Sequence, residues 1–203
     1  MKGKLLRVLF AVAFAAAFTA AGYVIAQQKQ SPQVRRVVTK LDDSGKAVVM
    51  IDEHTPLTAP RPPNYAANVW VTSTNLPDFT NAADRGKTKI GLVPPKGGTV
   101  FRIVDFAPDS QGEQPTDPNF MMKIVGAEAP KRGLPPRHPM MHRTRSLDYG
   151  IVMSGEIDML LDEGEVHFKA GDVFVQQATN HAWVNRGKVP ARVAFILIDS
   201  QEP

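Results

Sequence analysis

The C-terminal part of the chain alternates between short apolar strand candidates and glycine-centred turns. Ser154-Gly155, Asp162–Gly164 and Arg186–Lys188 are typical of the breaks between them. Many short strands separated by such turns, without a convincing long helix, predict an all-β sandwich or barrel. The candidate strands are Leu147–Met153, Glu156–Leu161, Glu165–Phe168, Val173–Gln176, Ala182–Asn185 and Arg192–Ile198.

The upstream part of the chain predicts a hairpin and two further strands. Arg35–Lys40 and Ala47–Ile51 are rich in β-branched residues and flank the turn residues Asp43–Gly45, which predicts the hairpin. Val69–Thr72 predicts a short strand. Thr99–Phe106 alternates apolar and polar residues, as a half-buried strand does.

Two upstream segments lack a clear strand pattern. His54–Pro63 contains four prolines, and we expect an extended loop there. Phe120–Val125 fits either a strand or a single helical turn. The sequence shows no phosphate-cradling glycine loop, serine nucleophile elbow or zinc-finger spacing, so these function classes gain no support.

The first 26 residues have the marks of a secretory signal peptide. A basic start without acidic residues leads into the apolar run Val8–Ala26, which ends with Val24 and Ala26 at the −3 and −1 positions. We predict cleavage after Ala26 and export to the periplasm or the exterior, with residues 27–34 as a flexible tether. An uncleaved membrane anchor is the alternative, because about 18 apolar residues can span a bilayer.

Charge and cysteine content narrow the function of the remaining chain. The leader carries three of the 24 Lys and Arg residues and none of the 20 acidic residues, so the mature part has a net charge of about +1. A clustered basic field is what nucleic-acid binding requires, and we therefore predict no nucleic-acid partner. The absence of cysteine excludes disulfides, thiol catalysis and thiolate metal ligands. Residues 35–203 are enough for one independent domain, and we predict no membrane contact beyond the leader.

The segment that starts at His142 resembles the first sequence motif of the cupin superfamily. That motif runs H-x-H, three or four residues, E, six residues, G. His142, Asp148 and Gly155 stand at its first histidine, its glutamate and its glycine, and Thr144 stands at its second histidine.

The segment from Gly171 to Asn185 resembles the second cupin motif, which ends in H-x3-N. His181 and Asn185 match that end, Gln177 replaces the proline, and the spacing from Gly171 to His181 is one residue short. The resemblance covers residues 137–198 and implies a jelly-roll β-barrel that the upstream strands complete.

A metal site follows from the geometry of strands and barrels. Residues two apart on a strand share a face, so His142 and Thr144 can both point inward. A barrel interior brings distant residues together, so Asp148 and His181 can converge on His142. Two imidazoles and a carboxylate suit Fe, Mn, Zn or Ni and leave coordination positions open. We predict these three residues as metal ligands, Asp148 also as a catalytic group, and His138 as an additional ligand.

Structural interpretations stand beside the metal site. His142 and His181 can be hydrogen-bonded histidines of a cupin without metal, and Asp148 can pair with Arg143 or Arg145. The predicted substrate-pocket residues are Thr144, Tyr149, Gln176, Trp183 and Asn185.

The resemblance implies a metal-dependent enzyme that acts on a small organic molecule. The implied chemistry is that of an oxygenase, isomerase, dehydratase or decarboxylase. The fold does not choose among these four, because one fold hosts many activities. The alternative is a non-catalytic exported protein that binds a small ligand in the barrel, which Thr144 and Gln177 favour. A sugar-modifying cupin of the cell envelope is a third hypothesis. We also expect a homodimer, in which the Arg35–Lys40 strand covers a sheet edge of the neighbouring subunit.

Overall fold

The computed structural model describes residues 32–201, except 75, 80–82, 114 and 126–134. The predicted signal peptide and residues 27–31 of the predicted tether lie outside the described residues. The chain divides after Pro32, and the unit that follows holds all of the strands described below. Within the described ranges, no helix is long and apolar enough to cross a membrane.

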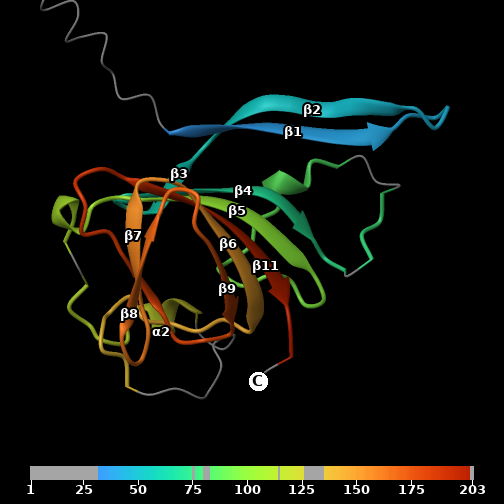
Figure 1. Cartoon of the computed structure of the whole chain (residues 1–203). Coiled ribbons are helices and arrows are strands. Elements are labelled where there is room, and N and C mark those ends of the chain that lie inside the picture. Colours follow the sequence, from blue (N-terminus) through green and yellow to red (C-terminus); the bar gives the residue numbers. More distant parts are fainter. Residues whose placement is uncertain (1–31, 75, 80–82, 114, 126–134, 202–203) are drawn as a thin grey trace, which may run out of the picture. The chain divides into compact units, whose positions relative to one another are not determined.

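Two antiparallel sheets form the barrel, as Figure 1 shows. The larger has the strand order β3-β4-β5-β11-β6-β9, the smaller has the order β10-β7-β8, and β1 pairs with β2 as a separate hairpin. This is the all-β jelly-roll architecture that the sequence predicts. The strands are β1 (Gln33–Leu41), β2 (Ala47–Pro56), β3 (Thr58–Arg61), β4 (Asn64–Thr72), β5 (Thr99–Phe106), β6 (Ser146–Ser154), β7 (Glu156–Leu160), β8 (Glu165–Lys169), β9 (Val173–Gln177), β10 (Ala182–Val184) and β11 (Ala191–Asp199).

The core lies where the two sheets pack face to face. Trp183 of β10 meets Phe174 of β9 and Phe195 of β11, with ring centroids 4.9 and 5.7 Å apart. Val152 of β6 and Ile157 of β7 are fully buried in the same cluster. Tilted and edge-on aromatic pairs of this kind stabilise a core beyond the area that they bury.

Two glycines permit this packing. Gly150 lies under the ring of Phe174, and a Cβ atom at position 150 would overlap the ring carbons. Gly155 turns the chain from β6 into β7 with a φ of +74°, a conformation that side chains rarely adopt. The motif glycine at 155 therefore serves the turn.

The β1–β2 hairpin is joined to the barrel by a buried arginine. Arg36 contacts Asp84 at 2.6 Å and Glu53 at 2.5 Å, and also donates to the carbonyl of Val69 in β4 at 3.1 Å. Asp84 caps the short 3-10 helix η1 (Arg85–Lys87). A second short 3-10 helix, η2 (Asp109–Gln111), and the helix α2 (Phe120–Val125) follow β5.

The strands agree with the sequence predictions within one residue from β5 onward. The loop predicted at His54–Pro63 is wrong in part, because β2 continues to Pro56 and β3 covers Thr58–Arg61. Proline is tolerated on an edge strand, and β3 is at the edge of the larger sheet. The last two residues of the predicted tether belong to β1, which begins at Gln33. Phe120–Val125 is helical.

Candidate functional site

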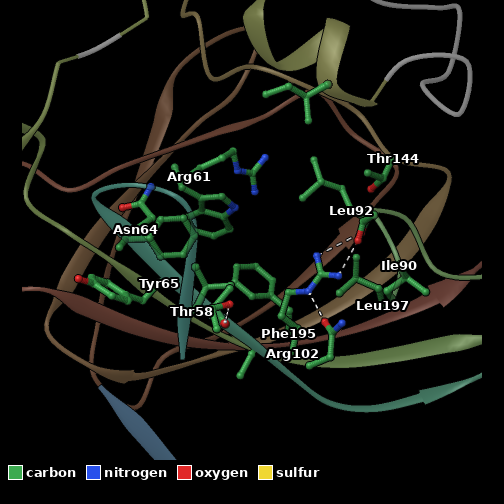
Figure 2. Close-up of a pocket in the computed structure, with 18 of the residues that line it drawn as sticks. Thr58, Arg61, Asn64, Tyr65, Ile90, Leu92, Arg102, Thr144, Phe195 and Leu197 are labelled. Atoms are coloured by element: carbon green, nitrogen blue, oxygen red, sulfur yellow. Dashed lines mark hydrogen bonds between the residues drawn. The ribbon is translucent and has the colours of Figure 1, made fainter. Parts of the chain in front are cut away.

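A cavity of about 690 Å³ lies inside the barrel and is lined by residues of both sheets (Figure 2). Its volume is within the range of about 300–1,000 Å³ that is usual for small-molecule sites. Apolar residues such as Phe195 and Leu197 form much of its wall. Of the predicted site residues, the cavity wall includes His142, Thr144, Asp148, His181 and Trp183.

His142 and His181 meet on one wall of this cavity. The two residues form an isolated antiparallel bridge, with backbone N–H donors bonded to the partner carbonyls at 2.9 and 3.0 Å. His181 directly precedes β10, so the bridge extends the smaller sheet by one position. The bridge places the ring centroids 4.4 Å apart. The predicted convergence of these two histidines is confirmed.

Both imidazoles are held in the same tautomer. The Nδ1 atom of His142 contacts the carbonyl of Met140 at 2.9 Å, and that of His181 contacts the carbonyl of Thr179 at 3.0 Å. A carbonyl can only accept, so each Nδ1 carries the hydrogen and each Nε2 keeps its lone pair. Within the described part of the chain, neither Nε2 atom has a hydrogen-bond partner. This is the arrangement of a metal-ligating histidine.

Burial keeps both rings uncharged. It lowers the pKa of His142 to about 4 and the pKa of His181 to about 3, and the proximity of His142 lowers the latter further. Arg61 also contributes to the low pKa of His142. The pair is therefore neutral at physiological pH and presents two nitrogen lone pairs.

Asp148 is a buried carboxyl group on the opposite, larger sheet. It is 4% exposed, and its Oδ1 atom has no hydrogen-bond partner in the described structure. Gln176, its register partner on β9, reaches Oδ2 only at 3.4 Å. Burial raises the pKa of Asp148 to about 6, although Ser146 and Arg102 act to lower it. The carboxyl group thus changes its charge close to neutral pH.

Asp148 lies apart from the histidine pair in the described structure. Among the described residues, no three His, Asp or Glu side chains lie close enough together to hold one metal ion. The hydroxyl of Thr144 is engaged with that of Ser146 at 2.9 Å. The histidine pair by itself fits two positions of a divalent transition metal, because neutral imidazole nitrogens are suitable donors.

His138 also lies apart from the pair. It is absent from the cavity wall, its Nδ1 accepts the N–H of Met140 at 3.2 Å, and its charged neighbours include Asp109. The prediction that His138 replaces the missing motif histidine gains no support from these contacts.

The other predicted pocket residues have structural surroundings. Tyr149 is 42% exposed and absent from the cavity wall. Asn185 is buried and donates from Nδ2 to the carbonyls of Phe106 and Val189, both at 2.9 Å. Gln176 is buried beside Asp148 without reaching the cavity wall.

The proposed pairing of Asp148 with a neighbouring arginine is wrong. Arg143 donates to the carbonyl of Ala178, and Arg145 contacts Asp199. The arginine whose charge acts on Asp148 is Arg102.

Two arginines of the cavity wall, Arg61 and Arg102, were not among the residues predicted from the sequence. Arg102 occupies the same face of β5 as Val100, Val104 and Phe106, which pack in or against the core. A charged residue on the apolar face of a strand was thus a signal in the sequence that Arg102 points into the barrel. Arg61 lies in the proline-rich segment and carried no comparable signal.

Comparison with known proteins decides the family. Residues 128–198 match the family model described as cupin domain. Phomopsin biosynthesis cluster protein C' of Diaporthe leptostromiformis is 33% identical over 187 residues, which cover 86% of this chain and 85% of the relative. The chain belongs to the cupin superfamily.

Other similar proteins include cupins that are named as oxidoreductases. The cupin-domain-containing oxidoreductase srdD of Neurospora crassa is 31% identical over 179 residues, covering 84% of this cupin and 77% of the relative. The cupin-domain-containing oxidoreductase virC of Hypocrea virens is 48% identical over 106 residues, which cover 50% of this cupin and 41% of the relative. Among solved structures, a Cupin 2 conserved barrel domain protein from Salinispora arenicola matches with 14% identity and a TM-score of 0.37, covering 70% of this cupin and 81% of that chain.

Proposed function

We propose that this cupin is an exported oxidoreductase that acts on a small organic molecule inside the barrel cavity. The observation that carries the proposal is the neutral pair His142 and His181, which presents two Nε2 lone pairs at the wall of a ligand-sized cavity. The relatives that are named as oxidoreductases support the reaction class.

The histidine pair is the proposed anchor for a divalent transition metal, with Fe, Mn, Zn or Ni as candidates. When bound, such a metal supplies Lewis-acid or redox chemistry at coordination positions left open for substrate. The carbonyls of Met140 and Thr179 orient the two rings through their Nδ1 atoms.

Asp148 has a separate proposed role, the transfer of a proton at Oδ1. A general acid or base works best when its pKa lies near the working pH. Burial brings the pKa of Asp148 to about 6, and Oδ1 has no partner in the described structure that would compete for a proton. Trp183 and Phe195 contribute apolar walls to the cavity that Asp148 also lines.

Metal content per subunit tests this function. The full chain is purified without chelator or histidine tag and offered each candidate metal, with Fe(II) added under anaerobic conditions. We expect about one metal ion per wild-type chain and a loss of about a hundredfold in affinity for His142→Ala and His181→Ala. His167→Ala is the matched control, because His167 is on β8 with its side chain 61% exposed and should not alter binding. A folded wild type that stays empty with every metal contradicts the proposal.

A non-catalytic ligand-binding cupin is the second candidate. It is favoured because, among the described residues, no carboxylate or further histidine lies close enough to the histidine pair to form a three-ligand site. Under this alternative, His142→Ala changes the affinity for a ligand or the stability, and wild type and variant alike turn over no substrate. Oxidation of a candidate substrate by metal-loaded wild type, and its loss in the variant, would exclude the binding-only role.

Export is proposed from the first 26 residues of the sequence. The intact mass of the protein recovered outside the cytoplasm tests it, with Gln27 as the expected first residue. Recovery of the full-length chain in a membrane fraction would favour the anchor instead.

We also propose a homodimer. The outer face of β6 and β9 exposes the facing pairs Tyr149–Val175 and Ile151–Val173, and β9 is an edge strand. The β1–β2 hairpin exposes further apolar residues, including Leu41. A second copy that covers this face would bury apolar surface and protect the edge. Light scattering at micromolar concentration should show a dimer that Val175→Glu dissociates, and a monomeric wild type would contradict it.

A further inference from the structure

Three cations and one carboxyl group line the cavity. Among the described lining residues, the basic side chains are Arg61, Lys89 and Arg102, and the acidic one is Asp148. Figure 2 shows Arg61 and Arg102 extending into the space that the lining side chains surround. With Asp148 ionised, the cavity wall is still net positive. A concave site with apolar walls and one sign of charge favours a ligand of the opposite sign.

Among the residues that the structure describes, Arg61 has no carboxylate partner. Within that part of the chain, its one hydrogen bond runs from Nη1 to the thioether sulfur of Met121, at 3.5 Å. A thioether is a weak acceptor, so most of the donors of this guanidinium remain available to a ligand. Arg61 is half-buried, and the partial loss of water around the guanidinium lowers its pKa.

Arg102 is held in place by neutral acceptors. Its Nε donates to Asn68 Oδ1 at 2.8 Å and its Nη2 to the carbonyl of Gly91 at 2.8 Å. The positive charge of Arg61 adds to burial in lowering the pKa of Arg102 to about 10. The two cations therefore repel each other across the cavity, and an anion placed between them would relieve that repulsion.

Four arginines elsewhere in the described structure are paired with carboxylates. Arg35, Arg36 and Arg192 each contact an Asp at 2.8 Å or less, and Arg186 contacts Asp158 at 2.7 Å. These four arginines stabilise the fold through their ion pairs, whereas Arg61 has no such partner among the described residues. A half-buried cation without a described carboxylate partner is costly, and a ligand that carries a negative charge would offset that cost.

We infer that the cavity binds an organic carboxylic acid, with its carboxylate on the guanidinium of Arg61 and its apolar body against Trp183, Phe195 and Leu197. The planar fork of Arg61 matches the two oxygens of a carboxylate. Arg61 is close enough to His142 to lower its pKa, so an acid held there would place its remaining atoms toward the histidine pair. The inference rests on the proposed function, in that the cavity is taken to be the substrate site.

Binding of matched acids and amides tests the inference directly. The probes are benzoate, hexanoate and octanoate, each compared with its primary amide, and the full chain is first treated with chelator so that no metal can bind the carboxylate. We expect at least one acid to bind about tenfold or more tightly than its amide, which corresponds to one charge-assisted pair.

Three variants test whether Arg61 causes the preference for the acid over the amide. Arg61→Gln should remove the preference for the acid and leave the affinity for the amide unchanged, and Arg61→Lys should retain part of it. Arg35→Gln removes the same charge from the exposed hairpin and should change neither affinity. If Arg61→Gln fails to fold by thermal melting, the comparison between Arg61→Lys and wild type decides.

Several outcomes overturn the inference. These are equal binding of every acid and amide, no binding of any acid, an unchanged preference in Arg61→Gln, or binding of phenyl phosphate about tenfold tighter than benzoate. Because the chelated protein is used, failure here leaves the metal proposal intact. Conversely, an acid site without metal uptake would contradict the proposed function alone.

Discussion

The two walls of the cavity hold their polar groups in opposite ways. On the smaller sheet, each ring of the His142–His181 pair has its Nδ1 fixed by a backbone carbonyl and stays neutral. On the larger sheet, Asp148 and Arg61 are charged groups with few protein contacts. The first wall is organised before any ligand arrives, and the second is left to be completed by one. The proposed metal site and the proposed anion site are thus on different walls of one cavity.

The largest expected effect is the acid sensitivity of the histidine wall. Both folded-state pKa values lie below the ordinary value of 6.5, so the unfolded chain binds more protons below that pH. The stability is complete above pH 6.5 and falls as the pH drops toward 4, by about 5 kcal/mol if both rings contribute. Urea unfolding of the chelated protein between pH 7 and 4 measures this loss.

The double variant His142→Gln/His181→Gln is the control for that experiment. Its unfolding free energy should change much less over the same pH range, because glutamine does not titrate. An equally steep loss in the double variant would show that other groups cause the acid sensitivity.

Asp148 should show the opposite dependence on pH. Its folded-state pKa of about 6 lies above the ordinary value, so its contribution to stability is complete below about pH 4 and is lost as the pH rises through 6. At pH 8, Asp148→Asn should therefore be more stable than wild type by about 3 kcal/mol. At pH 4 the two should differ little. A destabilised variant at pH 8 would mean that the carboxylate has a partner.

The smallest expected effect is that of replacing Arg61, and the paired Arg36 provides the contrast. Arg61→Leu should change the unfolding free energy by less than about 1 kcal/mol, because no described carboxylate loses a partner. Arg36→Leu should cost about 3 kcal/mol, since Asp84 and Glu53 lose their buried cation. Thermal melts of both variants check the contrast, and a large loss in Arg61→Leu would make that residue structural.

The sequence was enough to predict the barrel and one wall of its cavity. Alternation and glycine turns located the C-terminal strands, and the spacing of His142 and His181 in two motifs predicted that they meet. Both depend on local patterns, which a single sequence displays.

The other wall depends on which strands lie opposite each other. Asp148 was predicted to point inward and does, but its distance from the histidines follows from the pairing of β6 with β9 and β11, which motif spacing does not specify. Arg61 belongs to a proline-rich edge strand whose position is determined by tertiary contacts. The role of such a residue becomes visible only when the cavity is known.

The separation of the two walls is tested most directly by the metal affinity of Asp148→Asn, measured by equilibrium titration beside wild type and His142→Ala. The structure predicts that Asp148→Asn binds metal within about twofold of wild type while His142→Ala loses about a hundredfold. If Asp148→Asn loses the metal as His142→Ala does, the carboxylate is a ligand and the two walls form one site.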